Sequence, residues 1–256
     1  MTSPKEEAKM YLLEAPRENS CDERGKFAIF GEACRILEDA RIPHVMGGGV
    51  AIRAYGRSRP LKDADLFMQK TYVFSAMDEL TRRGAFHTRD TDATWLYKAI
   101  KSDVLVDIIV RTTGNIHMTP ETYERARMVE LYGHPFRMMG PEDLLIRKIH
   151  SHREGRPDLS DAVSMLEAPI PKFDWRYFQR LAITNDYHRV LGFLLWVQAE
   201  FGATDVPPWL IRNLTERVLA DYGGASSKNP APGAALRAVS LWNPQRATAL
   251  DADGHL

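Results

Sequence analysis

The first half of the chain alternates between helical and extended hydrophobic periodicity. Phe27, Phe30, Cys34 and Leu37 recur at the spacing of an amphipathic helix, which predicts a helix over residues 22–41. Short apolar runs bounded by turn-forming residues follow. They predict strands over 42–46, 63–68, 95–100, 104–110 and 134–139, with helices over 50–55, 73–83 and 119–131 between them. This order of elements predicts a mixed sheet covered by helices.

The pattern changes at Gly140-Pro141, after which nearly every segment has helical periodicity. We predict helices over 141–152, 159–166, 174–183, 188–201 and 207–219. After Gly223-Gly224 the sequence is rich in Ala, Ser, Pro, Asn and Gly, which is typical of chain without a packed core. We therefore expect an α+β fold with a lead-in (1–22), a sheet domain (23–140), a helical domain (141–222) and a flexible tail (223–256).

The composition is that of a soluble globular protein. The chain has 256 residues, of which 44% are hydrophobic and 27% charged, and its 34 basic residues balance 34 acidic ones. Because the chain has no net positive charge, we expect no extensive surface that binds nucleic acid. A local basic patch is still compatible with a net charge of zero. Two cysteines without a zinc motif, no signal peptide and no membrane-spanning apolar segment lead us to expect a cytoplasmic protein without membrane association.

Two aspartates stand two residues apart just after a glycine cluster. Asp63 and Asp65 begin a predicted strand, where residues i and i+2 share a face about 6.5–7 Å apart at Cα. Paired carboxylates at this distance suit Mg²⁺. The preceding glycines, Gly47 to Gly49, supply a turn whose backbone N–H groups can hold phosphates. The combination predicts chemistry on a nucleoside triphosphate.

A third acidic residue, Asp107, lies inside the apolar run 104–110. An ionised carboxylate buried there needs a compensating charge. Metal ions bound by Asp63 and Asp65 on a neighbouring strand would supply it, and carboxylates around two cations about 3.5–4 Å apart form the usual site for nucleotidyl displacement. Taken alone, Asp107 is equally compatible with a strand end or an arginine partner. Together with the glycines and the aspartate pair, it favours the metal site.

These motifs resemble the polymerase-β-type nucleotidyltransferase superfamily. The resemblance covers about residues 42–166 and is carried by Gly47-Gly48-Gly49, Gly56-Arg57-Ser58-Arg59, Asp63-Ala64-Asp65 and Val106-Asp107-Ile108. It is nearest to the bacterial abortive-infection (AbiEii-like) toxin branch, in which a lysine on a helix is followed by an arginine and an aspartate. The corresponding residues here are Lys148, Arg153, Arg156, Asp158 and Asp161.

The resemblance implies a nucleotidyltransferase fold and a role for each matching residue. Asp63, Asp65 and Asp107 would be catalytic and would bind two Mg²⁺ ions, and Lys148 would be catalytic through its contact with the triphosphate. The implied nucleotide-binding residues are Gly47, Gly48, Gly49, Arg57, Arg59, Lys148, Arg156 and Asp158. The implied reaction transfers a nucleoside monophosphate from an NTP to a hydroxyl and releases pyrophosphate.

The acceptor and the biological role stay open. The hydroxyl could belong to a tRNA 3′ end, to a small molecule such as an aminoglycoside-like sugar, or to a protein. The toxin branch further implies an antitoxin partner. A non-catalytic nucleotide- or partner-binding module with the same fold is the alternative, because Gly49-Val50 replaces a serine of the family and Leu61 replaces a threonine or serine.

Other side-chain clusters have simpler interpretations. His150 and His152 are two residues apart on a predicted helix and point about 200° apart, so they would not chelate a metal together. The basic cluster Arg147, Lys148, Arg153 and Arg156 fits either a phosphate contact or a solvated helix face. Aromatic residues between 175 and 196 recur at near-helical spacing, which favours core packing.

Overall fold

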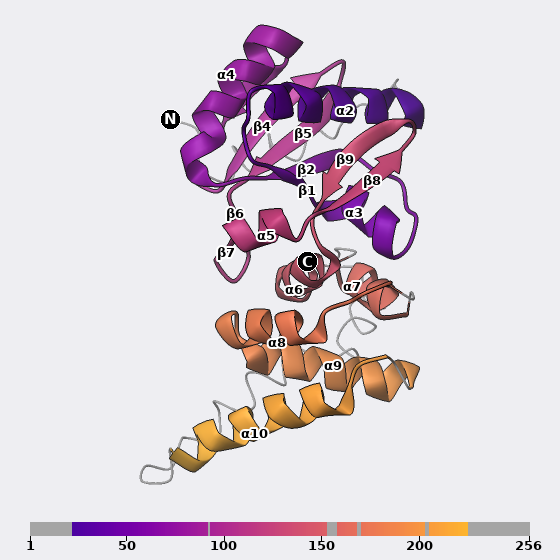
Figure 1. The fold of residues 1–256 in the computed structure, drawn as a ribbon, viewed down its shortest axis with the longest axis vertical. Coiled ribbons are helices and arrows are strands. Elements are labelled where there is room, and N and C mark those ends of the chain that lie inside the picture. The colour runs from indigo at the N-terminus through magenta and orange to yellow at the C-terminus, as the bar shows by residue number, and fades with distance from the viewer. Residues whose placement is uncertain (1–21, 92, 153–157, 168–169, 203–204, 225–256) are drawn as a thin grey trace, which may run out of the picture.

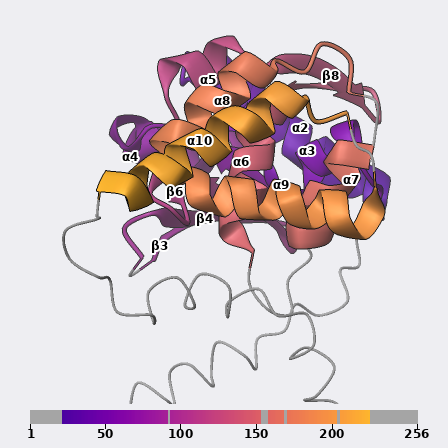
Figure 2. The same cartoon turned by 90° about the horizontal axis from the view of Figure 1, so that it is seen from below.

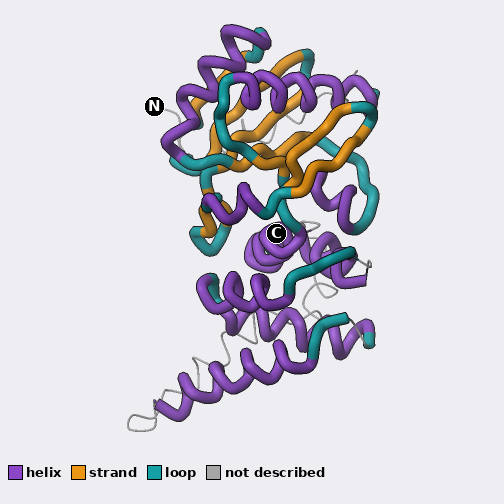
Figure 3. Tube along the Cα trace, viewed as in Figure 1, coloured by secondary structure: helices purple, strands orange, loops and turns teal. Residues whose placement is uncertain are grey.

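A seven-stranded mixed sheet forms the centre of the N-terminal part of the chain, and a stack of helices follows it (Figures 1 and 3). The structure, a computed structural model, describes residues 22–91, 93–152, 158–167, 170–202 and 205–224. The predicted α+β class is confirmed. The predicted lead-in and tail lie almost wholly outside the described residues, and the proposed domain boundaries stay a prediction.

The order of strands brings segments that are distant in sequence next to each other. Across the sheet lie β3 (His87–Asp90), β4 (Leu96–Lys101), β5 (Val104–Ile109), β2 (Asp63–Phe67), β1 (Val45–Met46), β9 (His134–Met138) and β8 (Arg127–Leu131). β2 pairs with β5, and β1 with β9, in parallel, and the other pairs are antiparallel. A separate small ladder joins β6 (Arg111–Thr112) to β7 (Ile116–His117).

Two helices, α2 (Glu23–Asp39) and α4 (Val73–Gly84), cover one face of the sheet (Figure 1). Helix α2 begins where the Asp22 carboxylate accepts a hydrogen bond from the Gly25 N–H at 2.7 Å, an N-cap that satisfies one of its free donors. Its apolar stripe is fully buried at Phe27, Phe30 and Leu37, as its periodicity predicts. The short η1 (Lys70–Tyr72) leads into α4.

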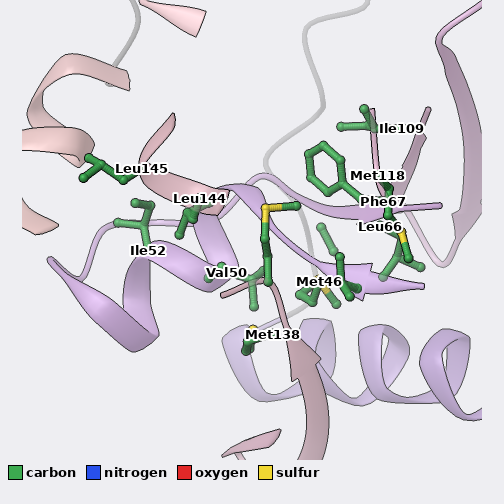
Figure 4. Packing of buried hydrophobic residues seen from close by; sticks show 14 of the residues in the cluster. Met46, Val50, Ile52, Leu66, Phe67, Ile109, Met118, Met138, Leu144 and Leu145 are labelled. Carbon is green, nitrogen blue, oxygen red and sulfur yellow. The ribbon is translucent and has the colours of Figure 1, made fainter. Parts of the chain in front are cut away.

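The opposite face is covered by α3 (Gly48–Tyr55), α5 (Pro120–Glu124) and α6 (Pro141–Ser151). The hydrophobic core continues from the sheet into this layer, where Val50 and Ile52 of α3 lie beside Leu144 and Leu145 of α6 (Figure 4). All four side chains are 1% exposed or less. Helix α6 therefore joins the sheet to the helical part of the molecule.

The helical part consists of α7 (Asp158–Glu167), α8 (Trp175–Thr184), α9 (Tyr187–Phe201) and α10 (Pro208–Gly224), with α9 and α10 at its far side (Figures 1 and 2). Tyr177, Phe178 and Phe193 are buried, which confirms that the aromatic positions serve core packing. Within the described part of the chain, every helix is too short or too polar to cross a bilayer.

The predicted helix over residues 119–131 is wrong beyond its first turn. Helix α5 spans Pro120–Glu124, and residues 127–131 form β8, which pairs with β9. A hairpin turn at Tyr132-Gly133, both with positive φ (53° and 81°), brings the two strands together. Helix-favouring residues such as Glu130 are thus overridden by the tertiary pairing. The short strands β3, β6 and β7 were not predicted either.

Candidate functional site

The register of the sheet places the three aspartates on one face. Asp65 lies directly opposite Asp107 in the parallel β2–β5 ladder, and Asp63 precedes Asp65 by two residues on the same face. The alternate residues of both strands, such as Ala64, Leu66 and Val106, are fully buried. All three aspartates line a single cavity of about 520 Å³, beside Gly48, Gly49 and Lys148. The expected convergence of these residues is therefore present in the fold.

Asp107 has a cationic partner that the sequence analysis missed. Lys98 stands directly opposite it in the β4–β5 ladder, and the Lys98 Nζ lies 2.8 Å from Asp107 Oδ1. Desolvation raises the pKa of the buried Asp107 carboxyl, Lys98 lowers it, Asp63 raises it further, and the net shift is upward. The available signal was a lysine at an alternating position of an otherwise apolar strand.

The glycine cluster forms the beginning of a helix as well as a turn. Gly47 is the N-cap of α3, and its N–H donates to the Asp65 carbonyl at 2.8 Å. Gly48 has φ +54°, and a Cβ atom added there would stand 1.5 Å from Asp65 Oδ2. Glycine is therefore required here by both backbone conformation and contact. The N–H groups of the first turn of α3 have no partner within the helix and lie beside Asp65, and a helix N-terminus favours anions.

Three of the predicted phosphate-binding cations converge on one buried carboxylate. Arg57 Nε lies 3.0 Å from Asp161 Oδ1, Arg59 Nη2 lies 3.2 Å from Asp161 Oδ2, and Lys148 Nζ lies 3.0 Å from Asp161 Oδ2. Lys148 also contacts Asp158 Oδ1 at 2.8 Å. Arg59, Lys148 and Asp158 line the cavity. Arg153 and Arg156 lie outside the described residues.

Asp161 connects three elements that are distant in sequence. Its side chain is fully buried on α7, while its partners belong to α6 and to the loop before β2. Desolvation alone would raise the pKa of Asp161, but the positive charges of Lys148 and Arg59 hold it below its usual range. Asp161 therefore stays ionised and fixes the positions of the cations around it.

The cavity continues beyond the aspartates into a region that the sequence analysis did not assign. An apolar section comes first, lined by Phe67, Trp95, Leu96, Ile109 and Leu144. The far end is polar, lined by Arg111, Thr112, Thr113, Arg147 and Ser151. Arg147 is 3% exposed and had been noted only as part of a basic cluster.

The donor chemistry of the aspartates fits a divalent cation, because three carboxylates face one cavity and hard oxygen ligands suit Mg²⁺. Among the residues that the structure describes, no three His, Cys, Asp or Glu side chains stand close enough together to hold a metal ion. Asp107 is instead engaged with Lys98. The aspartates thus match a magnesium site in the kind of ligand they offer, but they are not gathered into a coordination shell.

The chain belongs to the family described as nucleotidyl transferase of unknown function (DUF2204), whose profile matches residues 26–190. This match confirms the resemblance to nucleotidyltransferases, and the protein is accordingly a nucleotidyltransferase-family member. The narrower placement in the abortive-infection branch stays a prediction. No curated protein matches the chain in sequence.

Several solved structures share features of this fold. The chain is 14% identical to ANT(2″)-Ia in complex with adenylyl-2″-tobramycin, with a TM-score of 0.39 over 68% of this chain and 97% of the other. The chain is 14% identical to an antigenic nucleotidyltransferase-like protein from Paracoccidioides brasiliensis, with a TM-score of 0.39 over 66% of this chain and 91% of the other. The chain is 13% identical to the Megavirus polyadenylate synthase, with a TM-score of 0.39 over 66% of this chain and 37% of the other. We draw no functional argument from similarities this distant.

Replacing Gly48 by alanine is expected to destabilise the protein by more than about 1 kcal/mol, because the new Cβ adds left-handed backbone strain to its clash with Asp65. Gly192→Ala is the matched control. It lies inside α9 with no atom within 4 Å of the added Cβ, and should stabilise by about 0.5–1 kcal/mol. Urea unfolding measures both changes, and equal effects would contradict the proposed constraint at Gly48.

Asp161→Asn is expected to lower the free energy of unfolding at pH 7 by about 3–5 kcal/mol, because it leaves buried cations without their shared anion. The folded-state pKa of Asp161 is lowered, so its contribution exists above the unfolded pKa near 4 and disappears as the pH falls below it. The difference between variant and wild type should therefore shrink in acid. Asp39→Asn, at an exposed ion pair with Arg83, should cost at most about 1 kcal/mol.

Proposed function

We propose that this protein transfers a nucleoside monophosphate from an NTP to a hydroxyl group in a Mg²⁺-dependent reaction. The observation that carries the proposal is the side-by-side placement of Asp65 and Asp107, with Asp63 on the same sheet face, in one cavity. The N-terminus of α3 and the ammonium group of Lys148 border that cavity. Membership of the nucleotidyl transferase family supports the same general chemistry.

In this proposal Asp63, Asp65 and Asp107 would hold two Mg²⁺ ions, which supply positive charge to the phosphates. The N–H groups of Gly48 and Gly49 would bind phosphate oxygens, and Lys148 and Arg59 would balance their charge. The acceptor oxygen forms a bond to the α-phosphorus, and the bond to the bridging oxygen breaks. Pyrophosphate leaves with the electron pair, and the hydroxyl proton passes to the carboxylate of Asp107.

The narrower assignments derive from the sequence resemblance. A tRNA 3′ end, a small molecule or a protein as acceptor, and a toxin role with an antitoxin, stay predictions. The alternative is a non-catalytic module that binds a nucleotide or a partner protein. The intact set of three aspartates and the paired Lys148 favour the enzyme.

Asp65→Asn is expected to reduce transfer at least about 100-fold, because it removes negative charge where the cations must bind. Purified protein would be incubated with α-labelled NTPs, Mg²⁺ and either total tRNA or cell extract, and the labelled product quantified. Asp78→Asn, an exposed position on α4 with a side chain 75% accessible, is the matched control and should transfer label like the wild type.

Label that fails to reach any acceptor, together with persistent nucleotide binding, would contradict the enzyme and favour the module. Growth arrest on expression that disappears in Asp63→Ala would support the toxin role, and unimpaired growth would remove it.

A further inference from the structure

The polar far end of the cavity contains groups that lack an anionic partner. Arg111 on β6 donates its Nη1 hydrogen bond to the neutral Asn115 side chain at 3.2 Å, and among the described residues it makes no recorded ion pair. The Thr112 hydroxyl is buried without a hydrogen-bond partner. A buried hydroxyl is normally hydrogen-bonded, so an unsatisfied one at Thr112, beside the partly buried Arg111 in the same cavity wall, points to a ligand.

Arg147 adds a second cation to the same region. Its Nη1 group lies 3.3 Å from Asp143 Oδ1 and its Nη2 group donates to the His117 carbonyl at 2.8 Å, so the guanidinium is held in place. Arg147 is 97% buried and lines the cavity. Its Nε is buried and has no hydrogen-bond partner. A fixed arginine with a donor to spare is suited to an oxygen anion.

The sign of charge at this end discriminates between acceptor classes. Apart from the three aspartates, the described residues that line the cavity include one carboxylate, Asp158, and it is paired with Lys148. A polycationic aminoglycoside-like sugar would meet the guanidinium groups of Arg111 and Arg147, of which Arg147 is paired with Asp143 and Arg111 has no acidic partner among the described residues. An anionic acceptor would meet two guanidinium groups and the Thr112 hydroxyl.

We infer, on the basis of the proposed function, that the acceptor carries a phosphate group, which binds Arg111, Thr112 and Arg147 while its hydroxyl faces Asp107. The alternate residues Asp107, Ile109 and Arg111 all line this cavity. Four residues of extended chain span about 13 Å at Cα, and the long arginine side chain covers part of this distance. Between the two ends, Trp95 and Ile109 offer an apolar surface for a ring.

The test compares a 5′-phosphorylated ribodinucleotide, ribose 5-phosphate and tobramycin, each as an acceptor for label and each as a ligand in calorimetry. We expect a phosphate-bearing probe to bind and tobramycin not to bind. Arg111→Met should weaken binding of that probe at least about tenfold and leave NTP binding unchanged. The dinucleotide and the sugar phosphate distinguish a nucleic-acid end from a free metabolite. Arg24→Met, an exposed position in the first turn of α2, is the matched control and should bind like the wild type.

Binding of tobramycin, or equal binding by Arg111→Met and wild type, would overturn the inference, as would the absence of binding by both phosphate probes. Calorimetry does not depend on turnover. Phosphate-probe binding without any transfer of label would therefore refute the proposed reaction and leave the anion site standing.

The ion pair between Lys98 and Asp107 carries a separate inference. The Lys98 Nζ lies 2.8 Å from Asp107 Oδ1, and the Lys98 side chain is 26% exposed. A divalent cation at the aspartates would compete with this ammonium group for the same carboxylate. The structure assigns Lys98 the role of an internal counter-cation that must release Asp107 when a metal binds. Lys98 is thus a positioning residue that weakens metal binding.

Lys98→Met should tighten binding of Mn²⁺ about tenfold, or about 1.4 kcal/mol, as measured by electron paramagnetic resonance on the nucleotide-free protein. Lys98→Arg retains the charge and should bind like the wild type. Lys101→Met is the matched control. Lys101 lies on the same strand, has a side chain 28% exposed and pairs with Glu32 at 2.7 Å, but its odd spacing from Lys98 directs it to the other face.

Unchanged or weaker Mn²⁺ binding in a folded Lys98→Met protein would overturn the role of Lys98. Tightening by Lys101→Met to the same extent would also overturn it, because it would show a general charge effect.

Discussion

The electrostatic repulsion among three carboxylates on one sheet face is the constraint on which the rest of the site depends. Asp65 and Asp107 are immediate neighbours in the β2–β5 ladder, and Asp63 is the next residue on that face. Like charges so placed destabilise a fold unless cations compensate them. Among the described residues, the ammonium group of Lys98 on β4 supplies such a compensating charge to Asp107. Hydrophobic burial of the alternate residues holds the strands together despite this cost, because Ala64, Val106 and their neighbours are fully buried.

A second charge cluster has the opposite arrangement, because three cationic side chains surround one buried carboxylate. Arg57, Arg59 and Lys148 would repel one another and move freely if each were solvated. Asp161 binds all three from a fully buried position, and thereby fixes them near the N-terminus of α3. Because Asp161 belongs to α7 and Lys148 to α6, the helical part of the molecule contributes directly to the shape of the site. Such preorganised charge favours catalysis because little rearrangement is needed when the substrate binds.

Much of this arrangement could be predicted from local sequence, and the rest depended on long-range pairing. The alternation around Asp63, Asp65 and Asp107 identified two strands, and their shared face followed from the expected fold. Lys98 was missed because its relation to Asp107 depends on the register of the β4–β5 hairpin. Asp161 was noted but given no role, since its contact with Arg57 spans 104 residues. The segment 127–131 was assigned to a helix because composition favours helix there, whereas pairing with β9 decides the outcome.

The distribution of charge along the cavity gives the site a direction. Its described lining contains four cationic residues, Arg59, Arg111, Arg147 and Lys148, and four carboxylates, Asp63, Asp65, Asp107 and Asp158. Lys148 is paired with Asp158, whereas Arg111 has no acidic partner among the described residues. A nucleoside triphosphate bound with two Mg²⁺ ions would be close to electrically neutral, so the proposed reaction would exchange partners within the site without adding much net charge. Lys98 would release Asp107, while Lys148 and Arg59 would share their charge between Asp161 and phosphate. In the proposed reaction Arg111 and Arg147 at the far end would take no part in that exchange, so their donors would stay available to the second substrate.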